Sequence, residues 1–217
     1  MPESLIEAAA QLFTSTERKS FGVTLGQVVD SLDTTGEGRV QVSLPWIPEV
    51  EPWCRVAVLS AGGGCGTYFV PQVDDEVLVA FDQGDIRDAF VIGSLWSATD
   101  KPPADLPSDA VDKRVIRTPK GHEIRFDDQQ QSLEIKSATG QKVTLDSKQI
   151  ALDAGDGAAK IVLETAGNVT IEAALDLKLK ATTVSIEGTT IDVKASAAGT
   201  LDGGASCTVK GTIVRIN

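Results

Sequence analysis

Residues with catalytic potential are few in this chain and do not form a recognisable set. His122 is the only histidine, so neither a Ser-His-Asp nor a Cys-His arrangement is convincing. Glu123, Asp127 and Asp128 could form an acid–base or cation cluster, but adjacent carboxylates at a turn are usually solvated. The sequence therefore predicts no catalytic residues and no enzymatic activity.

The cysteines give equally little reason to expect a metal or cofactor. Cys54, Cys65 and Cys207 have neither paired spacing nor a CxxC motif, which fits a chain made in a reducing compartment. Cys207 shares a phase with neighbouring apolar residues, so three copies of its thiol could meet on a three-fold axis and bind a soft metal. A buried apolar thiol is the simpler interpretation. We expect no cofactor and no metal site.

The elements that would position such residues are short strands, which follow one another from near Leu133 to the end of the sequence. Large aliphatic residues recur at positions i and i+2, flanked by charged or small polar residues. This spacing places them on one face of a strand, because successive side chains point to opposite sides. The predicted core positions of this region are Leu133, Ile135, Val143, Leu145, Ile150, Leu152, Val169, Ile171, Val184, Ile186, Ile191 and Val193.

Such strands cannot form a core in one chain in the usual way. Each offers two or three aliphatics, and no aromatic residue follows Phe126. A single-chain solenoid normally needs coils of about 20 residues or more, whereas the aliphatic pairs recur every ~6–11 residues. Three chains wound around one axis would each supply one wall per layer, and roughly ten layers at ~4.8 Å would give a rod on the order of 50 Å long. A monomeric three-sided β-helix is the alternative.

Charge is distributed unevenly between the halves of the chain. Residues 1–111 contain 6 basic residues (Lys and Arg) and 17 acidic residues (Asp and Glu), and residues 112–217 contain 14 basic and 14 acidic residues. The whole net charge of −11 therefore lies in the first half. A balanced half suits identical chains packed side by side, and an acidic first half disfavours nucleic acid as a partner. We find no signal peptide and no apolar run near the ~20 residues that a membrane span needs, so we expect synthesis in the cytoplasm.

The first half begins with a predicted amphipathic helix over residues 3–14, which places Leu5, Ile6, Leu12 and Phe13 on one stripe. A helix this short is marginal in water by itself. It either packs on the next domain or docks on a partner, and the sequence leaves both open.

Residues 21–97 alternate in a way that predicts five antiparallel strands, with a turn over residues 83–88 before the last strand. This number of strands in about 75 residues favours a five-stranded OB-type barrel, with an SH3-like barrel as the competitor. The expected organisation is an N-terminal segment (1–19), an OB-fold domain (20–97), a Pro-rich extended linker (98–116) and a β-helical spike (117–217).

The barrel also carries specific motifs. They are a Trp-x-Arg-Val strand, a Gly-rich loop closing on Phe-x-Pro, the sequence Asp-Glu-Val-Leu-Val-x-Phe, a Gly-Asp turn, Val-Ile-Gly-Ser-Leu and a Pro-Pro pair. The residues that carry them are Trp53, Arg55, Val56, Gly62, Gly66, Phe69, Pro71, Asp75, Glu76, Val77, Phe81, Gly84, Asp85, Gly93, Pro102 and Pro103. Over about residues 20–128 the chain resembles the central spike family of contractile injection machines, which includes phage baseplate assembly protein V and VgrG proteins. Asp74 stands where that family often has glycine.

The resemblance implies a homotrimeric structural spike at the centre of a baseplate, below the tube hub. Such a spike contacts the target membrane transiently and pierces it. The resemblance also implies a separate hub protein, for which we expect docking through Leu5, Ile6, Leu12 and Phe13. At the other end the family often has a PAAR-repeat tip protein, for which we expect a platform made by Ile213, Val214, Arg215, Ile216 and Asn217; a self-capped point is the alternative. The iron-binding His-x-His motif and the lysozyme domain of some relatives have no counterpart in this sequence.

Two rival functions come from other classes. A β-helical tailspike that degrades polysaccharide or binds a receptor would need carboxylate clusters and exposed aromatics on its wall, and the strand-rich region contains neither Trp nor Tyr. An OB-fold nucleic-acid binder is disfavoured by the acidic charge and by the sparse aromatic residues.

Overall fold

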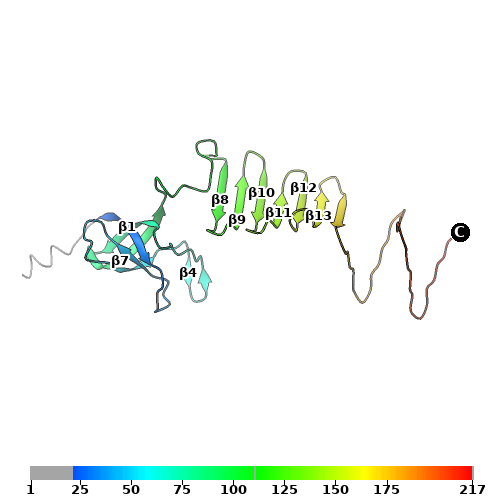
Figure 1. Cartoon of the computed structure of the whole chain (residues 1–217), viewed down its shortest axis with the longest axis horizontal. Coiled ribbons are helices and arrows are strands. Elements are labelled where there is room, and N and C mark those ends of the chain that lie inside the picture. The colour runs from blue at the N-terminus through cyan, green and yellow to red at the C-terminus, as the bar shows by residue number, and fades with distance from the viewer. Residues whose placement is uncertain (1–21, 110, 217) are drawn as a thin grey trace, which may run out of the picture. The chain divides into compact units, whose positions relative to one another are not determined.

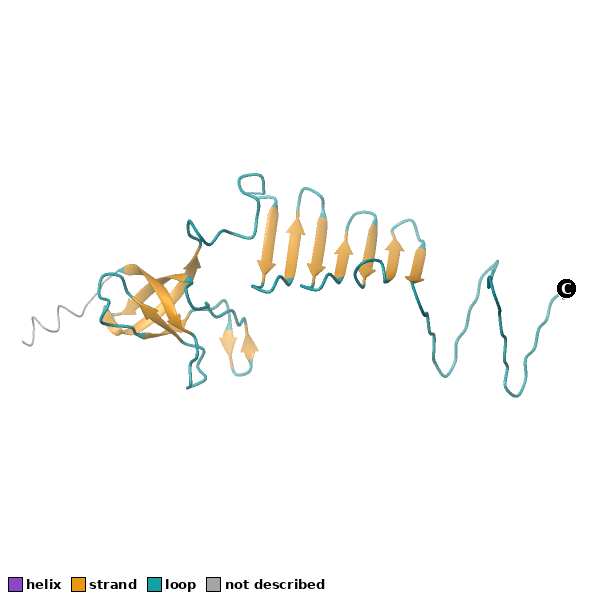
Figure 2. Ribbon diagram, in the orientation of Figure 1, coloured by secondary structure: helices purple, strands orange, loops and turns teal. Residues whose placement is uncertain are grey.

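The computed structural model describes residues 22–109 and 111–216, and its regular structure consists of β-strands, as Figure 2 shows. The expected all-β fold is therefore confirmed, and no helix in the described part is long and apolar enough to span a bilayer. The helix predicted for residues 3–14, with Leu5, Ile6, Leu12 and Phe13, lies outside the described residues. The chain divides into two compact units after Arg117.

The first unit is built on a closed five-stranded barrel, in which the strands follow the order β1-β2-β3-β7-β6; β1 and β7 of this barrel are labelled in Figure 1. Its strands are β1 (Val23–Asp30), β2 (Val40–Ser43), β3 (Trp53–Val56), β6 (Glu76–Asp82) and β7 (Asp85–Leu95). A separate hairpin of β4 (Ala61–Gly62) and β5 (Cys65–Gly66) lies in the long connection between β3 and β6. This confirms the barrel that the alternating pattern predicted.

Two details of the barrel differ from the prediction. The strands are not all antiparallel, because β3 and β7 pair in parallel. A closed ring with an odd number of strands cannot be antiparallel at every contact, so one parallel pair is a geometric necessity. The turn before the last strand is also shorter than residues 83–88, since β7 begins at Asp85 and only Gln83 and Gly84, both with positive φ, make the reversal.

The core of the barrel consists of aliphatic side chains that alternate along its strands and point inward. Those that are fully or almost fully buried are Val28, Val40, Val42, Leu44, Cys54, Val77, Val79, Ala89 and Val91. Gly26 lies among them, where an added Cβ would be 2.4 Å from Val42 Cγ1. The strands approach so closely at this point that no side chain fits, which explains the glycine in the middle of β1.

A seven-stranded meander contains all the strands that follow, in the order β14-β13-β12-β11-β10-β9-β8 (Figure 1). Its strands are β8 (Lys113–Arg117), β9 (Glu123–Asp127), β10 (Ser132–Lys136), β11 (Lys142–Leu145), β12 (Gln149–Asp153), β13 (Ala159–Glu164) and β14 (Val169–Ala173). From β9 onward each strand pairs antiparallel with the next. Strands of four to six residues with short links favour such nearest-neighbour pairing.

Three of the links between the strands of this sheet share a five-residue turn. In each, the amide of the first residue donates to the carbonyl of the fifth, and the amide of a glycine in fourth place donates to the carbonyl of the first. The three turns are Thr118–His122, Ser137–Gln141 and Glu164–Asn168, with N–O distances of 2.9–3.2 Å. The fourth residues, Gly121, Gly140 and Gly167, have φ values of 93°, 96° and 94°. Only glycine adopts this left-handed conformation without strain, so these three glycines fix three of the reversals, whereas residues 128–131 and 146–148 reverse without glycine.

Beyond Ala173 the chain changes character. Residues 174–216 are described, but none of them lies in a strand, and Figure 2 draws them as loop. Aliphatic pairs such as Val184 and Ile186, or Ile191 and Val193, therefore have no strand partner within their own chain. The winding of three chains around each other stays a prediction for this part.

Candidate assembly surface

One face of the meander carries two rows of large apolar side chains across the strands. The register pairs Ile124 with Ile135, Ile135 with Val143, and so on, so that residues of like chemistry stand opposite one another on every strand. The first row is Ile124, Ile135, Val143, Leu152, Ile161 and Ile171, and the second is Phe126, Leu133, Leu145, Ile150, Leu163 and Val169. We call these twelve residues the apolar rows.

The apolar rows are open to solvent in the single chain. Nine of the twelve side chains are exposed, from Leu145 at 36 % to Val169 at 65 %, and the other three, Ile124, Leu133 and Val143, are half-buried. A groove of about 580 Å³ runs along the first row, from Ile135 to Ile171. Exposed apolar patches of this extent mark interaction sites.

The opposite face of the same sheet is polar. Lys136 faces Glu123 and Lys142 faces Asp153, although the two lysines also stand opposite each other. Cross-strand pairs of opposite charge are favourable. Between the charged residues, Ala151 and Val162 are buried within this face, at 7 % and 9 % exposure. One face of the sheet is therefore apolar and the other is polar.

The sequence prediction named eight residues of the apolar rows, Leu133, Ile135, Val143, Leu145, Ile150, Leu152, Val169 and Ile171, and the structure brings all of them onto this face. The same spacing of two also assigned Ile161 and Leu163 to one face of a strand, and they form the β13 step of both rows. The other four predicted positions, Val184, Ile186, Ile191 and Val193, are exposed beyond the sheet.

The residues predicted to bind a tip partner lie at the end of the described chain. Ile213, Val214 and Ile216 are exposed, as is Arg215 between them. Asn217 lies outside the described residues.

The acidic residues near His122 do not come together as a catalytic or metal site. Glu123 and Asp127 are at opposite ends of β9; Glu123 Oε1 accepts a hydrogen bond from Arg125 (2.8 Å) and Asp127 Oδ1 accepts one from the Gln130 amide (2.8 Å). His122 Nδ1 accepts a hydrogen bond from the Ala138 amide of the next glycine turn (3.4 Å). Within the described residues no group of three His, Cys, Asp or Glu side chains could hold a metal ion.

The cysteines are also separate. Cys54 is buried in the barrel, and this burial raises the pKa of its thiol to about 12. Cys65 lies exposed in the β4–β5 hairpin and Cys207 is exposed in the tail. None of the three is in a disulfide.

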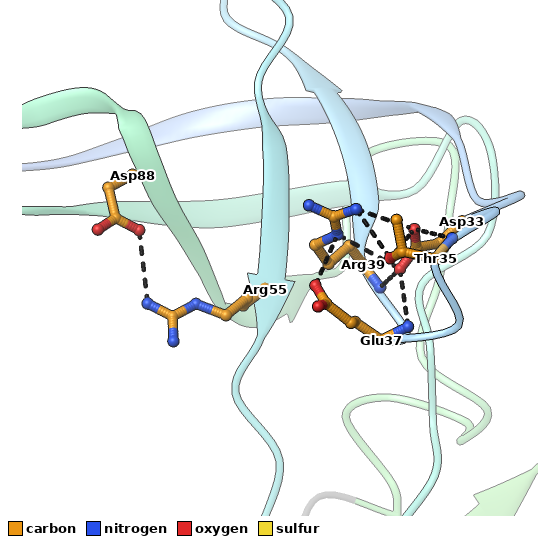
Figure 3. Close-up of polar contacts among 6 residues, drawn as sticks. All are labelled: Asp33, Thr35, Glu37, Arg39, Arg55 and Asp88. Carbon is orange, nitrogen blue, oxygen red and sulfur yellow. Dashed lines mark hydrogen bonds and ion pairs between the residues drawn. The ribbon is translucent and has the colours of Figure 1, made fainter.

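The sequence analysis missed a polar cluster that holds the loop between β1 and β2 (Figure 3). Asp33 accepts hydrogen bonds from the backbone amides of Thr35, Glu37 and Arg39, at 3.0–3.1 Å, and its carboxylate binds the Arg39 guanidinium at 3.2 Å. The Arg39 hydrogen bond lowers the pKa of the Asp33 carboxyl far below its ordinary value, and the Thr35 hydroxyl adds to this. Every acceptor position of Asp33 is thus used within its own loop, so the cluster is a structural clamp.

A second ion pair in Figure 3 is of a different kind. Arg55 Nη2 lies 3.4 Å from Asp88 Oδ1, and both side chains are more than half exposed. The Arg55 guanidinium also stands 4.3 Å from the centroid of the Phe90 ring. This contact lies on the outer surface of the barrel and closes no loop.

Comparison with protein families accounts for both units. Residues 24–96 match the type VI secretion system/phage-baseplate injector OB domain, and residues 113–176 match the phage baseplate V C-terminal trimerisation domain. The chain belongs to the phage baseplate V family. The family match places all seven strands of the meander, and with them the apolar rows, inside a trimerisation domain.

Curated relatives of this phage baseplate V chain are VgrG proteins. Over 101 residues, 42 % of this chain, it is 32 % identical to the type VI secretion system spike protein VgrG2a of Pseudomonas aeruginosa. Over 109 residues, 45 % of this chain, it is 36 % identical to the spike protein VgrG3 of Vibrio cholerae. It is also 32 % identical over 103 residues, again 42 % of this chain, to the actin cross-linking toxin VgrG1 of Vibrio cholerae. The matched segments make up only 12 %, 11 % and 9 % of these three relatives.

Proposed function

We propose that this chain is a structural, non-enzymatic spike of a contractile injection machine and that it acts as a homotrimer. One observation carries the proposal: within the matched trimerisation domain, one sheet face presents twelve apolar side chains in two unbroken rows, and the chain itself leaves nine of them exposed and three half-buried. Three such faces turned toward a common axis would bury the rows against one another. Burial of apolar surface is the main driving force for such association.

The barrel and the strand-rich region after it would have different roles. We propose that the barrel (20–97) sits next to the hub, that the linker ends at residue 112, before β8, and not at residue 116, and that residues 113–217 form the spike. The spike would transmit the thrust of the machine to a target membrane. The apolar rows would form a dry core, and the antiparallel ladders would make the walls stiff, because each strand of the meander is hydrogen-bonded to its neighbours.

We propose two protein partners at opposite ends of this spike. The N-terminal residues Leu5, Ile6, Leu12 and Phe13 would dock on a separate hub protein. Ile213, Val214, Arg215, Ile216 and Asn217 would form the platform for a PAAR-repeat tip protein, which the exposed aliphatic side chains of Ile213 and Ile216 support. We do not extend the toxin activity of the Vibrio cholerae relative to this chain, because the match covers 9 % of that relative.

Mass measurement in solution tests the trimer directly. The purified full-length chain should elute as one species, and light scattering should give three times the mass of the chain. Resistance to SDS without boiling should accompany the trimer, as expected for a core shared by three chains. A folded, stable monomer at micromolar concentration contradicts the proposal.

Partner binding tests the two ends separately. A PAAR-repeat protein that is co-expressed with this chain should co-purify with the wild type and not with an Ile213→Asp, Ile216→Asp double variant, since charge would disrupt an apolar platform. Deletion of residues 2–14 should abolish incorporation into assembled particles and leave the trimer intact. Unchanged incorporation would exclude docking through the N-terminal segment.

A further inference from the structure

The outer surface of the barrel differs from strand to strand. β2 shows the ordinary alternation, with its valines in the core and the polar residues Gln41 and Ser43 outward. β6 is apolar in both phases, because Leu78 and Ala80 alternate with its buried valines. A strand that reads as a continuous apolar run is typical of a sheet that is covered on both faces. The sequence of β6 therefore indicates that its outer face is covered as well.

The outward apolar residues of three neighbouring strands form one patch. Leu25 of β1 pairs with Leu78 of β6, and Val23 of β1 pairs with Ala80. Ala80 in turn pairs with Phe90 of β7. Together with an isoleucine two residues further along β7, they make up what we call the outer patch, which consists of Val23, Leu25, Leu78, Ala80, Phe90 and Ile92.

The described residues leave much of the outer patch open to solvent. Val23 is 58 % exposed, Leu25 48 % and Ile92 44 %. The remaining three side chains are half-buried. An apolar surface of this kind on an otherwise acidic domain marks a contact site.

The dimensions of the outer patch suit one helix better than a second barrel. Six side chains form it, whereas standard interfaces between two proteins use roughly 20–30 residues per partner. Its three strands lie about 10 Å apart from first to last, at ~4.8 Å per step. This width is close to the diameter of one α-helix, about 10–12 Å with side chains.

The sequence provides a predicted helix directly before β1. Residues 3–14, with the stripe Leu5, Ile6, Leu12 and Phe13, lie outside the described residues. Residues 15–22 connect them to Val23, which itself belongs to the outer patch. A connection of eight residues spans at most about 26–29 Å, so the stripe can reach the whole patch. A helix this short is marginal without a surface to pack on, and the patch is the nearest apolar surface along the chain.

We infer that residues 3–14 pack as a helix on the outer patch of their own barrel while no hub is bound. The stripe that we propose for hub docking is then covered in the free spike, and a hub must displace it from the patch. Covering a binding element lowers its apparent affinity by the fraction of time that it is exposed. This displacement step rests on the proposed docking to a hub, whereas the packing on the barrel does not.

Photo-crosslinking of the full-length free spike tests the packing. Phe13 is replaced by the photoreactive analogue p-benzoylphenylalanine, and the linked peptides are identified by mass spectrometry. The link should join residue 13 to residues 23–25, 76–80 or 90–92 of the same chain, so the denatured product keeps the mass of one chain. The same analogue at Gln11, which lies on the opposite side of the predicted helix, should give little of this product.

A matched pair of variants on β1 tests the patch itself. Leu25→Ser should lower the yield of the link from residue 13 at least about fivefold, because the contact loses a buried leucine side chain. Gln27→Ser introduces the same residue on the same face of the same strand, outside the outer patch, and should keep the wild-type yield. Equal yields in the two variants contradict the inference.

Circular dichroism gives a second measurement without the photoreactive analogue. Subtracting the spectrum of a chain that lacks residues 2–14 from that of the full-length chain should leave a helical spectrum in the wild type and in Gln27→Ser. In Leu25→Ser the difference should lose its helical minimum at 222 nm, since the helix depends on the patch. A helical difference in all three chains means that the helix forms without the barrel, and it contradicts the inference.

Irradiation of assembled particles separates the inference from the proposed function. There the link from residue 13 should go to a separate polypeptide, because the hub has taken the stripe. A link to the outer patch in both the free spike and the particles overturns hub docking through this segment and leaves the packing on the barrel standing. A free spike that gives no link to the outer patch, or a link to the barrel of a second copy, overturns the inference whatever the particles show.

Discussion

The barrel and the meander are built from similar strands, but they bury their apolar residues in different places. In the barrel the core valines of β1, β2 and β6 have no exposed surface, with Val28, Val42 and Val79 all at 0 %. In the meander the corresponding inward side chains, such as Leu152 at 43 %, are open to solvent. The difference lies in closure, since β1 of the barrel pairs with β6 and folds the sheet onto itself.

An open sheet with one apolar face needs a second layer to cover it. The barrel supplies this layer from its own strands, and we propose that the meander obtains it from two further copies. The same alternation of apolar and polar residues therefore codes for a complete domain in one half of the chain and for one third of a domain in the other.

A charge placed on the apolar rows should have the largest effect. Ile171→Asp should convert the trimer to monomer, because a carboxylate would have to be buried among aliphatic side chains. The barrel should keep its own unfolding transition, since its core is complete without the other copies. Light scattering and thermal unfolding monitored by the tryptophans, all of which precede Lys101, would measure the two effects.

The neighbouring residue provides the control for this variant. Thr170→Asp adds the same charge on the same strand, but Thr170 stands opposite Val162 on the other face. It should remain trimeric. Loss of the trimer in both variants would mean that the charge disrupts β14 itself, and it would remove the distinction between the faces.

A side chain added inside the barrel should have the next largest effect. Gly26→Ala would place a Cβ 2.4 Å from Val42 Cγ1 and 3.2 Å from Val79 Cγ2. Overpacking of this kind typically costs about 1–3 kcal/mol, so the unfolding free energy of the barrel should fall by that amount while the trimer persists.

Another strand glycine controls for the loss of backbone freedom. Gly93 in β7 has nothing within 4 Å of an added Cβ. Gly93→Ala should therefore leave the barrel unchanged or slightly more stable. Denaturant unfolding of both variants would show whether the close contact, and not the glycine as such, is what matters.

Periodicity was enough to predict the fold class and the face on which the aliphatic residues lie. The alternation at i and i+2 located Leu133, Ile135 and Val143 on one side. Strand partners could not be predicted in the same way, because alternation says which way a side chain points and nothing about which backbone lies beside it. The parallel β3–β7 pair and the end of the meander at Ala173 both depend on that second kind of information.

The Asp33 clamp was missed for a related reason. Its partners follow within six residues, at Thr35, Glu37 and Arg39, but a polar loop with Asp, Thr and Gly is also what any hairpin connection looks like. Only the convergence of three amides and a guanidinium on one carboxylate distinguishes it. The spacing of these residues in the sequence does not show that their groups meet at one carboxylate.

Asp33→Asn should destabilise the barrel by less than Gly26→Ala, because it loosens one loop and leaves the core intact. The folded-state pKa of Asp33 is lowered, so its contribution is fully present above the unfolded value of about 3.9 and is lost as the pH falls toward the folded value. The difference in Tm between wild type and variant should be constant from about pH 5 to 8 and should shrink below about pH 4. Glu37→Gln, which removes only the exposed partner of Arg39, should show a smaller difference.

The smallest effect should come from the ion pair on the outside of the barrel. Arg55 and Asp88 are 3.4 Å apart and both side chains are more than half exposed, and pairs of this kind contribute about 0–1 kcal/mol. Asp88→Asn also leaves Arg55 above the Phe90 ring, at 4.3 Å, so the guanidinium keeps one of its two contacts. Denaturant unfolding should show a change below about 0.5 kcal/mol, and Arg55→Ala should cost more than Asp88→Asn because it removes the ring contact as well. If Asp88→Asn cost more than Arg55→Ala, the ion pair would contribute more to the unfolding free energy than the ring contact does. The barrel would then depend on its surface charges, against what its closed core implies.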